Sequence, residues 1–424
     1  MSFFNRYKKI FLVIIFLLIV FGLGYLLWKF FFQEGFVEPG ITPISTSTPG
    51  GLPGIGPGGE VIDDITGPGR LPGFDEDGQP IIGTPIGQPS PEASAPSLVA
   101  DGGLTQIRTL VPSPVLNPTI TSDGRVQYYD KNDGHFYRID ENGNIIKMSD
   151  RVFHQVQQIT WAPNSQRAIL EYPDDTKIMY DFNTQKQVTL PSYWKDFSFA
   201  DNSEQIVAKS MGLDPDNRWL IVAGSDGSRA TAIEPIGTAD STVYPSWSPN
   251  NQIVAMYTKG VDFDRQEIFF VGMYGENFKS TIVEGRGLQT AWSQTGNNLL
   301  YSAYHSRDEY RPRLWVVEAS GDSIGANRRS LELNTWASKC TFATENEVYC
   351  AVPENLEAGS GMFPELADRT KDNLYKIDLN TGARSLIAVP AGAYNISQIM
   401  VPQNQNYLYF TDKSTEMIHQ VRLR

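Results

Sequence analysis

The chain has 424 residues, of which 41% are hydrophobic, and a formal net charge of −13. An acidic chain lacks the basic face with which proteins displace counterions from nucleic acids, so we expect no nucleic-acid partner. The hydrophobic content is sufficient for a large buried core, and the length alone would allow two or three domains.

The N-terminal residues predict a single membrane span. Residues 10–32 are almost wholly apolar, and their one charge, Lys29, lies near the end of the run, where its long side chain can reach the membrane surface. Basic residues precede the run and acidic residues follow it, which places residues 1–9 in the cytoplasm and the rest of the chain outside. A cleaved signal peptide is the alternative, although its apolar region would be shorter and would end at small residues. We therefore expect an uncleaved signal anchor in the cell membrane.

Residues 33–98 are predicted to form an acidic linker rich in proline and glycine. Between residues 39 and 98 there are 12 Pro, 13 Gly, seven acidic residues and one Arg in 60 residues. Such a segment cannot bury enough apolar surface to offset the conformational entropy that folding would cost. We interpret it as a disordered stalk, and its few isoleucines leave a partner-binding role open.

Residues 99–424 repeat one pattern seven times: a bulky apolar residue, a short polar turn and a second apolar run. Steps of roughly 40 to 60 residues between strand-rich units are typical of a β-propeller. Continuous apolar runs, such as 253–257 and 268–271, indicate strands buried on both faces between neighbouring sheets. We therefore predict an all-β fold, a seven-bladed β-propeller. The copies begin at Ile120, Trp161, Phe199, Trp247, Trp292, Phe342 and Val401.

The last unit, which begins at Gln398, contains only three predicted strands. The segment 105–111 stands alone before the first full unit and has the apolar alternation of an outer strand. A propeller must close or leave exposed sheet edges. We therefore predict that strand 105–111 is the fourth strand of the last blade and closes the ring.

The turn segments resemble the repeats of known propellers. Residues 247–251, Trp-Ser-Pro-Asn-Asn, and residues 122–125, Ser-Asp-Gly-Arg, are similar to the W-S-P-D-G-K pattern of WD-like repeats in TolB-type envelope proteins and in relatives of prolyl oligopeptidase. Residues 374–382 are similar to the third strand and turn of the same repeats. Most copies lack the Asp-Gly dipeptide, so the chain resembles a divergent member. The resemblance implies the propeller fold over residues 104–424 and a role in binding proteins or in gating access to a peptidase.

The two cysteines, Cys340 and Cys350, flank the turn of one predicted hairpin. Counting outward from Glu345 places them opposite each other, where antiparallel pairing can bring the side chains close enough for a disulfide. Such a bond can persist outside the membrane. Two small buried thiols that never oxidise are the alternative.

No residue pattern in the sequence predicts a catalytic site. The four histidines fall in different units without metal-ligand spacing, and there is no serine nucleophile elbow and no phosphate-binding glycine loop. The carboxylate pairs at 214/216 and 262/264 leave calcium open as a cofactor, with solvated turns as the alternative. We expect no cofactor and no enzymatic activity. A hydrolase, a lyase or a glycan-binding module with its site in the central channel is the alternative.

One side of the predicted ring carries long charged loops and aromatic links. Connections between second and third strands, and connections between blades, emerge on the same side of a propeller. Arginines and large aromatic residues dominate binding hot spots, and loops on a rigid scaffold often carry function. Solvated loops and gap-filling aromatics are the alternative. The candidate partner-binding residues are Tyr193, Trp194, Arg265, Arg307, Tyr310, Arg311, Trp336 and Tyr394.

These features predict a membrane-tethered, extracytoplasmic propeller that acts as a protein-interaction or scaffold module of the cell envelope. The expected partner is an envelope or surface protein, with a glycan as the alternative. Many functions share the propeller fold, so the residues specify the architecture better than the partner.

Overall fold

The computed structural model describes residues 17–18, 20–23, 25, 95–140 and 143–424. The chain divides into two units, residues 1–88 and 89–424.

The predicted membrane span, residues 10–32, lies mostly outside the described residues, as do the predicted cytoplasmic end and nearly all of the linker. Those residues between 17 and 25 that are described are helical. The part of the chain that the structure describes contains no helix with the length and hydropathy of a membrane span. The span therefore stays a prediction from the sequence.

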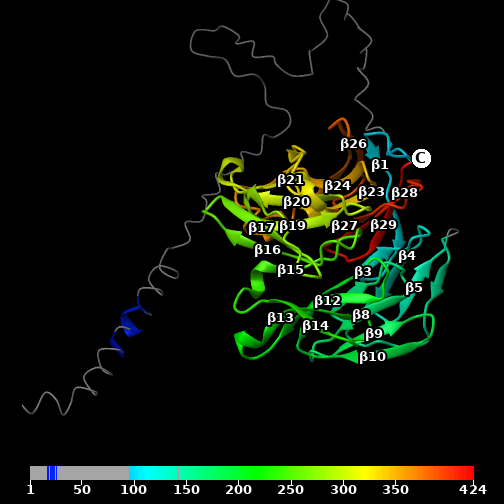
Figure 1. Ribbon diagram of the computed structural model, residues 1–424. Coiled ribbons are helices and arrows are strands. Elements are labelled where there is room, and N and C mark those ends of the chain that lie inside the picture. Colours follow the sequence, from blue (N-terminus) through cyan, green and yellow to red (C-terminus); the bar gives the residue numbers. More distant parts are fainter. Residues whose placement is uncertain (1–16, 19, 24, 26–94, 141–142) are drawn as a thin grey trace, which may run out of the picture. The chain divides into compact units, whose positions relative to one another are not determined.

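The seven-bladed, all-β propeller predicted from the repeats is confirmed. Six sheets of four strands and one of five follow one another in chain order around a ring (Figure 1). The first sheet comprises β3 (Val115–Ile120), β4 (Val126–Asp130), β5 (Phe136–Ile139) and β6 (Ile145–Lys147). The second comprises β7 (Gln158–Trp161), β8 (Arg167–Glu171), β9 (Lys177–Asp181) and β10 (Lys186–Leu190). The third comprises β11 (Trp194–Phe199), β12 (Gln205–Met211), β13 (Arg218–Gly224) and β14 (Thr231–Pro235).

The remaining four sheets repeat the same antiparallel order. The fourth comprises β15 (Val243–Pro245), β16 (Ala255–Gly260), β17 (Arg265–Val271) and β18 (Thr281–Glu284). The fifth comprises β19 (Arg286–Trp292), β20 (Asn298–Tyr304), β21 (Pro312–Glu318) and β22 (Arg329–Ser330). The sixth contains β23 (Cys340–Thr344), β24 (Glu347–Pro353), β25 (Asp372–Asp378) and β26 (Arg384–Pro390), and the seventh contains β27 (Ile396–Met400), β28 (Tyr407–Asp412) and β29 (Ile418–Arg422). Short 3-10 helices lie in the connections: η1 (Pro215–Asn217), η2 (Asp240–Thr242), η3 (Ser306–Asp308), η4 (Gly321–Ser323), η5 (Ala337–Lys339) and η6 (Pro364–Ala367).

The repeated polar turn joins the first two strands of a sheet. In the fourth sheet, the Ser248 hydroxyl accepts a hydrogen bond from the Ile253 N–H at 2.9 Å and donates to the Ile253 carbonyl at 3.1 Å. The Asn250 side chain donates to the Gly296 carbonyl of the next sheet at 3.0 Å. The serine therefore closes the turn, and the asparagine connects it to the neighbouring blade.

Hydrophobic cores lie between the sheets, one for each pair of neighbours around the ring. Seven clusters of buried residues span the seven junctions. The cluster between the seventh and first sheets contains Val111, Val115, Met400 and Ile418. These two sheets are therefore joined by the same kind of apolar packing as every other neighbouring pair. This placement explains the strands that are apolar on both faces.

The segment predicted as one closing strand, 105–111, is divided between two sheets. β1 (Leu104–Thr105) pairs in parallel with β26 of the sixth sheet, whereas β2 (Arg108–Val111) pairs antiparallel with β29 as the outer strand of the seventh. The cyan N-terminal strands accordingly lie beside the orange and red C-terminal ones (Figure 1). The two intervening residues cross from one blade to the next, so the segment joins two blades as well as closing one.

Candidate binding face

Two kinds of connection share one side of the ring: those between the second and third strands of a sheet and those between successive sheets. We call this side the loop face, and the opposite side, with the other hairpin turns, the turn face. Neighbouring connections of the loop face contact each other. The Ser306 hydroxyl donates to Asp264 at 2.7 Å, and the Gly359 N–H donates to the Glu309 carbonyl at 2.8 Å.

Both candidate tryptophans lie in the core. Trp194 is 4% exposed and Trp336 is 6% exposed. Trp194 packs in the cluster between the second and third sheets, and the Lys339 ammonium lies 5.7 Å from the ring centre of Trp336. The prediction that they are partner-binding residues is therefore corrected: both are buried packing residues, which is the alternative that the sequence left open for aromatic residues of this face. A bulky apolar residue at the point where a sheet begins fills the space beside the neighbouring sheet, and its sequence position alone does not distinguish this role from a surface one.

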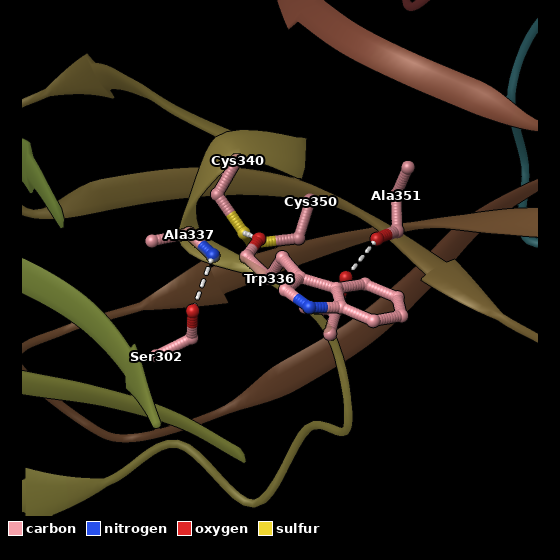
Figure 2. The surroundings of a disulfide bond; sticks show 7 residues. Ser302, Trp336, Ala337, Cys340, Cys350 and Ala351 are labelled. Carbon is pink, nitrogen blue, oxygen red and sulfur yellow. Dashed lines mark hydrogen bonds between the residues drawn. A yellow bond between two sulfur atoms is a disulfide. The ribbon is translucent and has the colours of Figure 1, made fainter. Parts of the chain in front are cut away.

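A disulfide joins Cys340 and Cys350 directly behind Trp336 (Figure 2). The two residues are register partners of β23 and β24, with their Cα atoms 4.1 Å apart. The adjacent backbone is held by two further bonds: the Ala337 N–H donates to Ser302 Oγ at 3.0 Å, and the Thr335 hydroxyl donates to the Ala351 carbonyl at 2.6 Å. The disulfide and these two hydrogen bonds thus fix the segment that leads into β23, the first strand of the sixth sheet.

The three candidate arginines lie on the loop face, and each is engaged by a carboxylate of its own chain. Exposed ion pairs of this kind contribute little to stability and can exchange for others. A hydrogen bond from Arg265 holds the pKa of Asp262 below its ordinary value. The arginines therefore form a charged border whose free hydrogen-bonding capacity is smaller than expected. The pairs are Arg265–Asp262, Arg307–Glu284 and Arg311–Glu309.

The three candidate tyrosines have different surroundings. Tyr193 is exposed, next to the buried Trp194. Tyr394 is half-buried against the rings of Phe410 and His419, with centroid distances of 5.3 and 4.8 Å, and burial raises the pKa of its hydroxyl. Tyr394 is therefore mainly a packing residue, Tyr193 is exposed, and Tyr310 is half-buried.

Tyr310 belongs to an apolar surface that sequence reasoning missed. Phe263, from the fourth sheet, is 68% exposed and meets the Tyr310 ring edge to face at 6.1 Å. Met362 and Phe363, from the sixth sheet, are also exposed, and the Gly361 N–H beside them donates to the Tyr310 carbonyl at 2.8 Å. We call Phe263, Tyr310, Met362 and Phe363 the rim patch. Large apolar residues inside charged loops were its only signal in the sequence.

A second missed feature is a cavity of about 960 Å³ on the loop face above the first three sheets. Three short segments supply most of its wall: residues 155–158, 171–177 and 195–196. Because these segments are distant in sequence and individually unremarkable in composition, only the fold brings them together.

Glu171 is the unusual group of this cavity. Its Oε1 atom is buried and has no hydrogen-bond partner among the described residues. Burial raises the pKa of the Glu171 carboxyl; the Lys177 ammonium opposes this effect, and the Asp196 carboxylate adds to it. The Lys177 ammonium itself is buried and donates to the Asp175 carbonyl at 3.0 Å. The cavity therefore contains an acceptor atom that makes no hydrogen bond with the described part of the chain.

A buried ion pair ties the loops over the sixth and seventh sheets. The Lys339 ammonium donates to the two carboxylate oxygens of Asp372 at 3.0 and 2.9 Å and to Asn395 Oδ1 at 3.2 Å. Asn395 donates in turn to the Ala367 carbonyl at 2.9 Å. Burial lowers the pKa of Lys339 and raises that of Asp372, and their mutual attraction opposes both effects. We call Lys339, Asp372 and Asn395 the buried latch.

The carboxylate pairs considered for calcium make local contacts. Asp214 Oδ1 accepts from the Asp216 N–H at 3.0 Å, and Asp262 Oδ1 accepts from the Asp264 N–H at 3.0 Å. Within the described ranges, no group of three or more His, Cys, Asp or Glu side chains is arranged to hold a metal ion.

No family model matches the chain, and no curated protein matches it either. The resemblance to TolB-type repeats therefore stays a prediction from the sequence.

Solved structures share the propeller architecture at low sequence identity. One concerns prolyl endopeptidases, with a TM-score of 0.50 and 11% identity, covering 74% of this chain and 49% of that chain. An oligogalacturonate lyase in complex with manganese has a TM-score of 0.48 and 9% identity, covering 75% of this chain and 93% of the other. The β-propeller domain of Myceliophteria thermophila Cps50 (Swd1) has a TM-score of 0.48 and 12% identity, covering 75% and 100%. These similarities concern the fold alone; the class, a seven-bladed β-propeller, is defined by the sheet topology of this chain.

Proposed function

We propose that this protein is an interaction module of the cell envelope, tethered to the membrane by the predicted span at residues 10–32 and bound to an envelope or surface protein through its rim patch. The observation that carries the proposal is the exposure of this patch. Phe363 is 54% exposed, and Phe263 is more exposed still, although both belong to a chain with seven well-packed internal cores. Contiguous exposed apolar side chains mark interaction sites in soluble domains.

The composition of the patch favours a protein partner. Aromatic residues, methionine and arginine are enriched at protein interfaces, where an apolar centre is surrounded by a polar border. In the rim patch, two phenylalanines, a tyrosine and a methionine lie beside the ion pairs of Arg265, Arg307 and Arg311. These apolar side chains supply contact area rather than a nucleophile, acid or base, so the proposed role is non-catalytic.

The test is capture of the partner by crosslinking in intact membranes, with the full-length protein as bait. Phe363→Ser removes the most exposed of the large hydrophobic side chains in the connection between β24 and β25. We expect it to reduce capture by about 1–3 kcal/mol of binding free energy, equivalent to roughly fivefold to more than a hundredfold. The melting temperature should stay nearly unchanged, because about half of this side chain is already exposed.

Tyr274→Ser is the matched control. Tyr274 is 82% exposed and lies on the turn face, between β17 and β18. It should leave capture unchanged. Loss of capture from Tyr274→Ser together with full capture by Phe363→Ser would refute the rim patch as the binding site.

The tether requires a separate test. Protease added to intact spheroplasts should digest the propeller and leave a small membrane-bound fragment. Complete protection of the propeller would refute the proposed orientation.

A further inference from the structure

The cavity above the first three sheets shares no residue with the rim patch and has different chemistry. Of its 14 lining residues, nine are Lys, Gln, Asp or Glu. Its volume of about 960 Å³ is at the upper end of the range for pockets that hold small molecules. It is therefore large enough for a ligand of several rings, and its walls offer mostly hydrogen bonds.

The charges around the cavity do not select an ionic ligand. Three lysines, at 131, 177 and 195, face three carboxylates, at 171, 175 and 196. Lys131 is paired with Glu416 at 2.7 Å, and Lys177 lies 3.5 Å from an Asp175 carboxylate oxygen. A strongly cationic or anionic ligand would meet charges of its own sign.

The polar groups of the wall require a ligand that both donates and accepts hydrogen bonds. Glu171 Oε1 is a buried acceptor without a hydrogen-bond partner in the part of the chain that the structure describes. Gln155, Gln157 and Gln158 are exposed side chains whose amides combine donor and acceptor atoms, and Lys195 adds a donor. A hydroxyl group donates one hydrogen bond and accepts others, so it matches such a wall at every position.

We propose that this cavity is a binding site for a neutral oligosaccharide, in which a sugar hydroxyl donates to Glu171 Oε1 and the glutamine amides bind neighbouring hydroxyl groups. The wall also contains apolar and aromatic side chains against which the C–H faces of a sugar ring can pack: Leu116, Tyr129, Val156, Tyr172 and Pro173. This site is independent of the partner-binding role of the rim patch.

The experiment is titration calorimetry of the full-length protein with three neutral tetrasaccharides, cellotetraose, maltotetraose and chitotetraose. Tetragalacturonate and a tetrapeptide with one lysine serve as the anionic and cationic comparisons. We expect at least one neutral tetrasaccharide to bind at least tenfold more tightly than either charged probe. Glu171→Ala should weaken that binding at least tenfold.

Glu171→Gln separates the sugar from a cationic ligand. Glutamine still accepts a hydrogen bond from a hydroxyl group but cannot pair with an ammonium group, so it should weaken sugar binding by less than about tenfold. Glu234→Ala, which removes an exposed carboxylate of β14 far from the cavity wall, should change nothing. Capture through the rim patch should be normal in all three variants, which keeps failure of this site distinct from failure of the proposed function.

Two results would overturn the proposal. In the first, no neutral tetrasaccharide binds. In the second, the lysine peptide binds best and Glu171→Gln abolishes its binding, which would assign the cavity to a cationic peptide segment.

Discussion

The loop face is open above the second sheet and covered above the sixth. In the second sheet, the connection between β8 and β9 is short, residues 172–176, and a cavity remains beside it. In the sixth, the connection between β24 and β25 is residues 354–371, and it is held down by the buried latch and by its contact with Tyr310. The same blade architecture therefore produces a polar hollow or an apolar surface according to the length and attachment of one connection.

This comparison predicts that the two regions fail in different ways. The covered region should lose stability when its internal ties are removed. The open region should lose binding with little change in stability, because the three glutamines of its wall are exposed and Glu171 Oε1 has no hydrogen-bond partner among the described residues. The substitutions below test this contrast.

The largest effect is expected from Lys339→Met. It leaves the buried Asp372 carboxylate without its ion-pair partner, which typically costs about 3–5 kcal/mol. Urea unfolding measures the loss, and limited proteolysis should show first cleavage in residues 354–371. Lys413→Met, which removes the exposed partner of Asp368, should cost less than about 1 kcal/mol. Equal effects of the two substitutions would mean that the latch does not hold the loop.

Trp194→Ala should be nearly as severe, although the sequence alone suggested a partner-binding residue. Removing a buried tryptophan leaves a cavity between the second and third sheets and typically costs about 3–5 kcal/mol. Tyr193→Ala, at the exposed neighbouring position, should stay within about 0.5 kcal/mol of the parent. Differential scanning calorimetry of the pair decides between a core and a surface role for Trp194.

Removal of the disulfide should have an intermediate effect. Its ends are 10 residues apart, and a loop of this size gives at most roughly 2–3 kcal/mol by restriction of the unfolded chain. We expect the Cys340→Ser/Cys350→Ser double variant to unfold at lower urea concentration. A reductant should produce the same shift in the parent and none in the double variant. A parent that does not respond to reductant would show that the bond contributes nothing to stability.

The smallest effect, and one of opposite sign, is expected from Glu171→Gln. Burial raises the pKa of this carboxyl above its ordinary value of 4.5, so the folded state binds more protons than the unfolded state just above that pH. Stability contributed by this group therefore falls as pH rises from 4.5 through the folded-state pKa. Glu171→Gln has no titrating carboxyl, so it does not lose this stability. The melting temperature of the variant minus that of the parent should therefore increase as pH rises across that interval. A constant difference at all pH values would show that Glu171 titrates normally.

Several parts of the fold could be predicted because they depend on local pattern. Seven polar turns between apolar runs indicated seven blades, and counting from Glu345 placed Cys340 opposite Cys350. Boundaries were less accurate. The second strand of the fourth sheet was expected to include Ile253, but the N–H and carbonyl of this residue both bond to the Ser248 hydroxyl, so it belongs to the turn.

The binding face was harder to predict because exposure depends on which blades become neighbours. Trp194 and Phe263 are both aromatic residues at connections of the loop face, yet one is buried and the other is 68% exposed. The cavity has no local signature, since Gln158, Glu171 and Lys195 come from two different sheets. Composition showed that the loops were charged and aromatic, and only packing shows which side chains a partner can reach.

The closure of the ring also determines when the molecule can fold. Thr109 of β2 and His419 of β29 are 310 residues apart in sequence, and their side chains lie within hydrogen-bond distance in the finished ring. At about 5–20 residues per second, a ribosome needs roughly 15–60 s to make the partner of β2 after β2 itself. During that time β2 lacks its partner β29, and its unpaired backbone groups can pair with other chains. The other blades form while the ring is still open. Protection of β2 by a chaperone, and late protection of its amides in pulsed hydrogen exchange, are the expected kinetic signatures of a propeller closed by the pairing of β2 with β29.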